Sequence, residues 1–266
     1  MTKQLDLVVL VLIVFFATAV SLFFRPPFLI VTILFSGLPS AYIIFRNSSL
    51  FKRAATTALV FGCIWAPAFD YFAVFNHAWN GTIHTGLLFP VLFNFVPLDI
   101  IMVYSIHIFL TAAFFDYFIA GDTSKSELLS PVRVACAGLI LIGILLFLSK
   151  AAPSLITVQY GYLAAGLAVV IPALVILFTR PRLFLPAIKT VPFFFFLYLF
   201  YDLTSFALTV NEFNGTYLGM LTVVGLRFPV EELVFWMILN SAVVTVYYSY
   251  FLRNDTAVAT PAIETI

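Results

Sequence analysis

Long apolar runs separated by short polar stretches dominate the pattern of this chain. A helix needs about 20 apolar residues to cross a bilayer, and eight runs approach that length. The pattern therefore predicts an all-α polytopic membrane protein with eight transmembrane helices, or seven if one run does not cross. The predicted spans are Leu5–Phe24, Phe28–Phe45, Ala54–Phe75, Pro97–Ile119, Val132–Ser149, Val158–Phe178, Ala187–Val210 and Pro229–Leu252.

Two further apolar stretches are too short to span. Gly86–Phe95 precedes the fourth run, and Tyr217–Leu226 precedes the eighth. Proline lacks the amide hydrogen needed inside a helix, so Pro90, Pro97 and Pro229 indicate breaks in these regions. Each stretch is expected to be an interfacial segment, a re-entrant segment, or the beginning of a longer helix.

Composition agrees with a membrane protein that lies in lipid. The chain has 63% hydrophobic and 9% charged residues, whereas soluble domains carry about 25% charged residues. A net charge of +1 implies no nucleic-acid partner. Cys63 and Cys136 lie in apolar runs without Cys/His spacing, so neither a disulfide nor a metal site is expected. Nucleotide and flavin motifs are absent from the sequence, and no cofactor is expected.

The basic residues predict an integral protein of the cell membrane with both termini in the cytoplasm, because Lys and Arg favour cytoplasmic loops. That orientation places ten of them inside and three outside. The inner set is Lys3, Arg46, Lys52, Arg53, Lys125, Arg133, Arg180, Arg182, Lys189 and Arg253, and the outer set is Arg25, Lys150 and Arg227.

An internal duplication is indicated by acids and prolines that recur 132 positions apart. Four spans in each half is an even number, so the two repeats are expected to be parallel. The pairs are Pro97 and Pro229 (229 − 97 = 132), Asp99 and Glu231 (231 − 99 = 132), and Asp70 and Asp202 (202 − 70 = 132).

The duplication divides the chain into four predicted parts. They are a first repeat at 1–120, a linker at 121–131, a second repeat at 132–253 and a disordered tail at 254–266. The four recurring acids are expected to lie at similar depth and to face one shared intramembrane site.

Glu231 is the first candidate for chemistry. A carboxylate is costly in hydrocarbon, so it is expected to stay protonated and able to donate a proton to an apolar substrate. Glu232 points about 100° away on the helix and faces Arg227, solvent or a neighbouring helix. The alternative is that both are first-turn acids stabilised by the helix end.

Other polar residues lie within the spans. Asp70 and Asp202 are functional candidates because intramembrane acids are rare and costly, although a hydrogen bond to a neighbouring helix is the alternative. His107 lies two turns beyond Asp99 and either relays a proton or joins two helices. Asp116 is interpreted as an interfacial charge.

Aromatic residues are abundant, with 32 phenylalanines in the chain. Aromatic ring faces attract cations, so a cavity of such rings beside an acid would suit a carbocation. The candidate substrate-binding residues are Tyr201, Phe206, Phe235 and Trp236. Packing against lipid is the alternative for most of the aromatic residues.

The segment Pro-Val-Glu-Glu-Leu-Val-Phe-Trp at 229–236, with Asn-Glu-Phe-Asn-Gly at 211–215 and Tyr-Asp at 201–202, resembles the lycopene cyclase domain. That family is marked by a Pro-x-Glu-(Glu/Asp) motif that opens a helix, and tandem fusions of it occur. The resemblance covers nearly the whole chain. It implies a non-redox cyclisation of the ends of a linear carotene within the bilayer.

By the same resemblance, Glu231 would be the leading acid, Glu232 would lie beside it, and Asp202 would be a support or a base. The first repeat departs from the motif, since Asp99 and Ile100 stand where the second repeat has its two glutamates. This difference favours a single asymmetric site. The motif leaves open the ring type, the substrate length and whether the chain forms a homo-oligomer.

Two other classes of function remain open at this stage. A proton-coupled transporter also fits duplicated halves with intramembrane acids and proline-broken helices, but it should line its path with small polar residues. A noncatalytic carotenoid- or quinone-binding subunit would keep the aromatic residues and would not need the acids.

Overall fold

The computed structural model describes residues 2–79, 88–92, 96–120, 131–208 and 213–253. The predicted linker, apart from Pro131, and the predicted tail lie outside these residues. Eight helical segments are long and apolar enough to cross a bilayer, which confirms an all-α membrane fold. They are α1 (Lys3–Phe24), α2 (Phe28–Thr32) continued to α3 (Leu38–Arg46), α4 (Phe51–Thr57) continued to α5 (Ala66–Phe75), α6 (Leu98–Phe114) continued to Ile119, α7 (Pro131–Ala151), α8 (Gly161–Thr179), α9 (Phe184–Ala207), and the last span, Glu232–Leu252, which contains α10 (Asn240–Tyr247).

The third and seventh spans begin six residues earlier than the apolar pattern predicts. The third begins at Ser48 rather than Ala54, because Asn47 caps its first turn by accepting the Ser49 amide hydrogen at 3.2 Å. The seventh begins at Pro181, a residue favoured at the first helical position since it has no amide hydrogen to lose. Capping chemistry extends these helices past their apolar runs.

Among the described residues, two pairs of short strands lie at the two stretches expected to be interfacial, re-entrant or the beginning of a helix, so the described parts of these stretches are not helical. Residues 86–87 and 93–95 lie outside the described residues, and an interfacial location stays a prediction. Strand β1 (Val91–Leu92) pairs with β2 (Val96–Pro97), and β3 (Met220–Val223) pairs with β4 (Leu226–Pro229), both antiparallel. The second hairpin turns through Val224 and Gly225, which both have positive φ (51° and 79°), as a two-residue hairpin loop requires. In each half the hairpin ends in the repeated proline, and the helix follows it.

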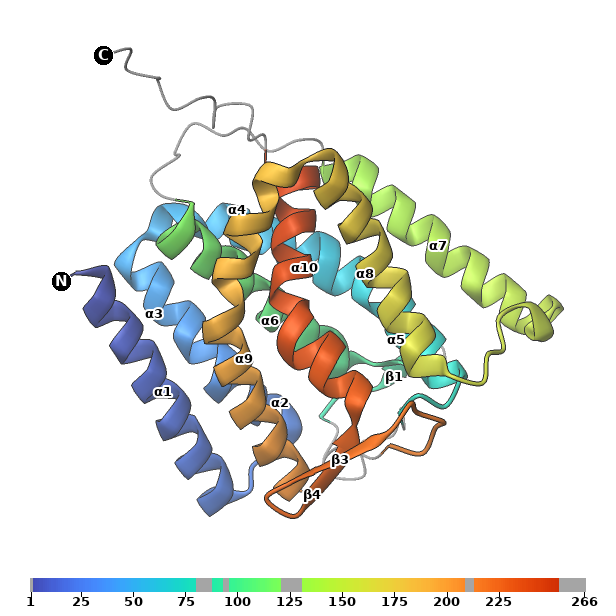
Figure 1. Ribbon diagram of the computed structural model, residues 1–266, viewed down its shortest axis with the longest axis horizontal. Coiled ribbons are helices and arrows are strands. Elements are labelled where there is room, and N and C mark those ends of the chain that lie inside the picture. Colours follow the sequence, from blue (N-terminus) through green and yellow to red (C-terminus); the bar gives the residue numbers. More distant parts are fainter. Residues whose placement is uncertain (1, 80–87, 93–95, 121–130, 209–212, 254–266) are drawn as a thin grey trace, which may run out of the picture.

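The two halves pack around a central pair of helices, and an outer helix of each half packs against a helix of the other half. In the first half α1 packs against α9 of the second, and α7 of the second half packs against α5 of the first. The α6 and α10 helices lie in the middle of the bundle (Figure 1) and contact each other. These two contacts are equivalent, since each joins the first span of one half to the third span of the other.

Equivalent residues meet at this central contact. The rings of Tyr104 and Trp236, 132 positions apart, have centroids separated by 5.9 Å. The Tyr248 hydroxyl donates to Asp116 Oδ2 at 2.7 Å, again across 132 positions. Residues related by a twofold axis can touch only near that axis, so the pseudo-twofold axis runs between α6 and α10. This arrangement supports two parallel repeats.

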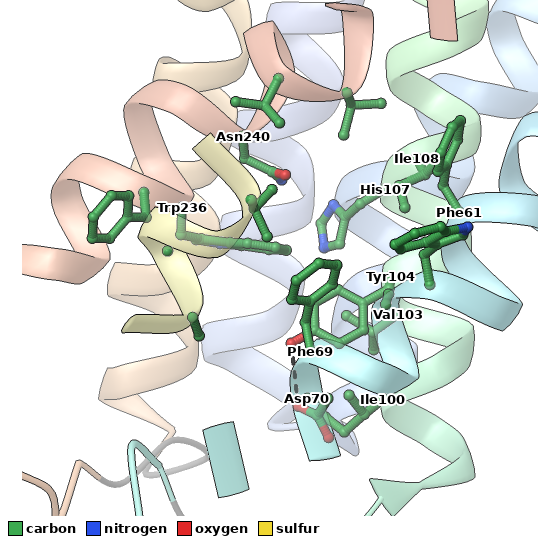
Figure 2. A pocket seen from close by; sticks show the side chains of 18 of the residues that line it. Phe61, Phe69, Asp70, Ile100, Val103, Tyr104, His107, Ile108, Trp236 and Asn240 are labelled. Atoms are coloured by element: carbon green, nitrogen blue, oxygen red, sulfur yellow. Dashed lines mark hydrogen bonds between the residues drawn. The ribbon is translucent and has the colours of Figure 1, made fainter. Parts of the chain in front are cut away.

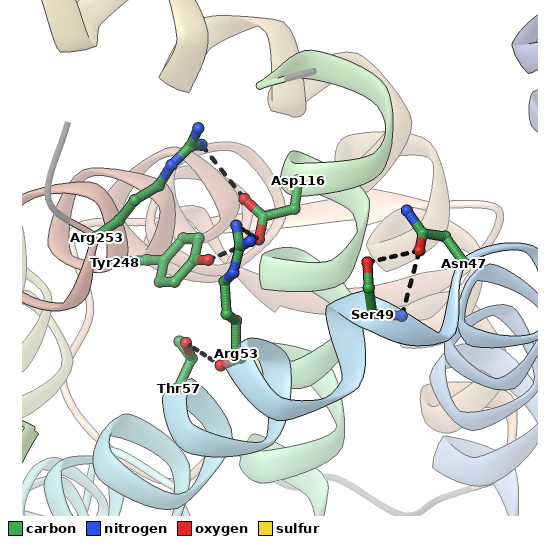
Figure 3. A network of polar contacts seen from close by, with 7 residues as sticks. All are labelled: Asn47, Ser49, Arg53, Thr57, Asp116, Tyr248 and Arg253. Carbon is green, nitrogen blue, oxygen red and sulfur yellow. Dashed lines mark hydrogen bonds and ion pairs between the residues drawn. The ribbon is translucent and has the colours of Figure 1, made fainter. Parts of the chain in front are cut away.

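Asp116 is buried inside the protein at one end of the bundle, and its interpretation as a charge at the membrane interface stays a prediction. Its carboxylate lies 3.3 Å from Arg253 Nη1 and 3.5 Å from Arg53 Nη1, in addition to the Tyr248 hydroxyl (Figure 3). The three partners come from α4 and the C-terminal end of the last span. The carboxylate thus ties the two halves together at one end of the bundle.

A second buried acid lies at the same end. Asp6 accepts hydrogen bonds from the hydroxyls of Tyr42 and Tyr117, both at 2.6 Å, and pairs with Arg46 Nε at 3.1 Å. The ammonium of Lys3 lies over the Tyr117 ring. Four basic residues assigned to the cytoplasmic side by sequence, Lys3, Arg46, Arg53 and Arg253, therefore gather at one end of the bundle. Their cytoplasmic location stays a prediction.

Candidate functional site

A cavity of about 520 Å³ lies within the helices, a size in the range of small-molecule sites. Its wall is mainly aromatic and aliphatic, and its residues come from every span except α1. Six pairs of its lining residues are related by the 132-residue spacing, so the cavity straddles the pseudo-twofold axis. They are Phe69 and Tyr201, Asp70 and Asp202, Ile100 and Glu232, Val103 and Phe235, Tyr104 and Trp236, and Ile108 and Asn240.

Asp70 is one of three carboxyl groups in the wall. It is buried on α5, where its Oδ1 accepts hydrogen bonds from Trp79 Nε1 at 3.1 Å and from the Tyr104 hydroxyl at 3.3 Å (Figure 2). Its Oδ2 has no partner among the described residues. One oxygen of Asp70 is therefore held by the protein and the other is left for a ligand.

Glu232 and Asp202 form a second acidic group. Glu232 accepts a hydrogen bond from the Tyr162 hydroxyl on α8, and its charge acts on Asp202 of α9, which lines the same cavity. Both side chains are buried, and Asp202 Oδ2 lacks a partner among the described residues. Asp202 and Glu232 therefore form an acidic group in the cavity wall.

Aromatic contacts join the two acidic groups across the axis. The rings of Trp79, which holds Asp70, and Tyr162, which holds Glu232, meet edge to face at a centroid separation of 5.0 Å. On the other side, Tyr104 meets Trp236. The cavity thus presents proton-bearing groups beside ring faces that stabilise positive charge.

The two halves of the cavity differ in their acidic residues at one pair of equivalent positions, which in the second half belongs to the Pro-Val-Glu-Glu segment. Glu232 corresponds to Ile100, and both line the cavity. The second half therefore supplies a carboxyl where the first supplies a hydrocarbon side chain. One acid-rich side of a single cavity agrees with the asymmetric site that the sequence favours.

Glu231 and Asp99 do not line this cavity, contrary to the expectation that the four recurring acids face one site. Asp99 accepts the backbone amides of Leu88 and Phe89 at 3.1 and 3.0 Å. Glu231 accepts the amide of Leu218 at 2.7 Å. The two acids are equivalent in structure as in sequence, since each anchors the segment leading into its β-hairpin.

The anchoring role predicts the effect of Glu231→Ala on stability. The change removes a hydrogen bond to a charged or acidic group, and such bonds contribute about 1.5–3 kcal/mol. We expect the thermal unfolding temperature in detergent to fall by several degrees. An unchanged unfolding temperature would contradict the role of Glu231 as an anchor.

The predicted substrate-binding residues divide in the same way. Tyr201, Phe235 and Trp236 line the cavity. Phe206 instead stacks on Phe228 at a centroid separation of 5.4 Å and meets Phe213 edge to face. Phe206 therefore packs the C-terminal end of α9 against strand β4 of the second hairpin.

Three residues of the site were not singled out from the sequence, namely Trp79, Tyr104 and Tyr162, which hold the cavity carboxyls. His107, which the sequence did single out, lines the wall. Tyr104 could have been found through its spacing of 132 from Trp236. His107 makes the helix-joining hydrogen bond that was one of its two readings, with Nδ1 lying 2.8 Å from Ser36 Oγ.

The chain matches no family model, no curated protein and no solved structure.

Proposed function

We propose that this protein is a membrane carotenoid cyclase, which closes the end groups of a linear carotene such as lycopene into rings without a net redox change. The observation that carries the proposal is the set of three buried carboxyls, Asp70, Asp202 and Glu232, in an apolar and aromatic cavity inside the membrane helices. The resemblance of residues 229–236 to the lycopene cyclase motif supports the same reading.

The reaction begins with a proton. Glu232 donates its proton to C2 of the terminal C1=C2 double bond, and a tertiary cation forms at C1. The C5=C6 double bond then attacks C1, which forms the ring bond and moves the charge to C5. Loss of a ring proton restores neutrality, so the protons taken and given balance.

The remaining lining groups suit this course. The ring faces of Trp236, Tyr201 and Phe235 stabilise the cation, and an apolar wall keeps out water that would otherwise capture it. Once Glu232 has lost its proton, the carboxyl groups of Glu232 and Asp202 together carry net negative charge beside the developing cation. Burial strengthens that attraction because the local dielectric constant is low.

The other classes of function fit the cavity less well. A carrier for polar solutes needs a path of small polar side chains, whereas the wall here is largely Phe, Trp, Val and Ala. A noncatalytic carotenoid-binding protein would gain nothing from three buried carboxyls, each of which is costly to keep from water. We therefore favour the enzyme.

The test is expression in bacteria that accumulate lycopene, followed by chromatography and absorbance spectroscopy of the extracted pigments. We expect monocyclic and bicyclic carotenes to replace lycopene. An empty vector is the control for background conversion. Unchanged lycopene in cells whose membranes contain the folded protein would refute the proposed substrate.

A further inference from the structure

One buried titratable side chain of the cavity has no part in the steps above. His107 lies on α6, three residues beyond Tyr104, and is 1% exposed. Its Nδ1 is hydrogen-bonded to Ser36 Oγ at 2.8 Å, which leaves Nε2 without a partner among the described residues. The imidazole projects into the cavity between Trp236 and Phe61 (Figure 2).

Aromatic rings enclose this imidazole. Tyr198, Tyr201 and Trp236 each meet it edge to face, with centroid separations of 5.3, 5.0 and 5.3 Å. The two tyrosine hydroxyls are bound elsewhere, one to Thr32 at 2.9 Å and the other to Asn240 at 3.2 Å. Neither hydroxyl competes for Nε2, and a buried polar atom without a partner is costly. The arrangement indicates a ligand that completes the interaction.

We propose that His107 is the base that takes the ring proton in the cyclisation, an inference that rests on the proposed function. In the tautomer whose Nδ1–H donates to Ser36, the lone pair of Nε2 faces the cavity. After ring closure the cation lies at C5, and Nε2 accepts the proton from an adjacent carbon. The C–H electron pair becomes the new ring double bond, and no oxidant is required.

The position of His107 separates the acceptor from the donor. The donor Glu232 lies four residues, about one helical turn, before Trp236, and the Trp236 ring meets the His107 imidazole. Trp236 and Tyr201 contact His107 and also line the space between, where their ring faces stabilise the cation. The imidazolium formed returns its proton to the carboxyl pair before the next turnover.

This assignment makes His107 a determinant of product as well as of rate. The carbon that loses its proton fixes the position of the ring double bond. An acceptor held in one place by Ser36 selects one carbon among those next to C5. Removing the acceptor should therefore change the mixture of ring isomers, and it should let water capture part of the cation as a tertiary alcohol.

The test compares His107→Asn, His107→Ala and the matched control His77→Asn in the lycopene-accumulating strain. The amounts of folded protein are made equal, as judged by the elution peak of the solubilised protein in size-exclusion chromatography in detergent. His107→Asn keeps a polar group near Ser36 but puts no base in the cavity. His77 is exposed, lies outside the cavity, and has a φ of 57°, a conformation that asparagine adopts readily.

We expect both His107 variants to lose about 10²–10⁴-fold in turnover and to shift the ring isomers or yield alcohol, while His77→Asn behaves as wild type. Added imidazole should restore part of the turnover of His107→Ala in isolated membranes. Folded His107 variants with wild-type rate and isomer mixture would overturn the assignment, and so would a loss of rate with neither an altered product mixture nor imidazole rescue. Absence of any cyclic product from the wild-type protein would instead refute the cyclase, and this inference with it.

Discussion

Glu232→Gln is expected to reduce conversion of lycopene by about 10²–10⁴-fold, the usual contribution of a positioned general acid. The amide cannot donate an acidic proton to the C1=C2 bond. It can still accept the hydrogen bond that the Tyr162 hydroxyl gives to Glu232, so the fold should survive. The measurement is carotene composition at equal amounts of protein in the membrane.

The neighbouring residue provides a matched control. Glu231→Gln makes the same chemical change one position earlier, where the side chain accepts the Leu218 amide and does not line the cavity. The amide oxygen can replace that acceptor, so we expect Glu231→Gln to keep most of its activity. The reverse result, an inactive Glu231→Gln beside an active Glu232→Gln, would show that Glu231 donates the proton.

Asp116→Ala is expected to be the most destabilising of the structural changes. It deprives Arg253, whose side chain is 2% exposed, and Arg53 of the carboxylate that they share. Removing one partner of a buried ion pair costs about 3–5 kcal/mol, because the remaining charge stays in a poorly solvated site. The measurement is thermal unfolding of the purified protein in detergent, followed by circular dichroism.

Tyr248→Phe is the control for that experiment. It removes only the hydroxyl that donates to Asp116 and leaves both arginines paired, so a loss of about 0.5–1.5 kcal/mol is expected. Equal effects of the two changes would mean that the ion pairs contribute little to the junction between the halves. No measurable loss in Asp116→Ala would reject the junction as a source of stability.

The strands at the two repeated prolines contradict the helical alternative for these stretches. The stretches at 86–95 and 217–226 are too short for their hydrophobic period to separate strand from helix. Pro97 was expected to open a helix, but it ends a strand, and so does Pro229. The decisive signal in the second hairpin is the pair of positive φ angles at Val224 and Gly225. Glycine adopts a positive φ readily, so Gly225 is compatible with a turn. A positive φ is uncommon for a β-branched residue, so Val224 would not be predicted at this position.

Rotation of one helix decided which of two adjacent carboxyls belongs to the site. Glu231 and Glu232 differ by about 100° around the helix axis, and nothing in their sequence says which direction faces the cavity. Tyr162 on α8 and Asp202 on α9 define that direction, and both are distant in the chain. By the resemblance Glu231 would be the leading acid, whereas the side chain that lines the cavity is Glu232.

The membrane class, the eight helices and the spacing of 132 residues follow from the sequence alone, because hydrophobicity and spacing are properties of single segments. That Asp70, Asp202 and Glu232 share a cavity with His107, while Asp99 and Glu231 anchor hairpins, is visible only in the packed structure. That outcome depends on how helices from both halves turn and pack around one axis. Contacts between distant segments set those rotations, and no single segment contains them.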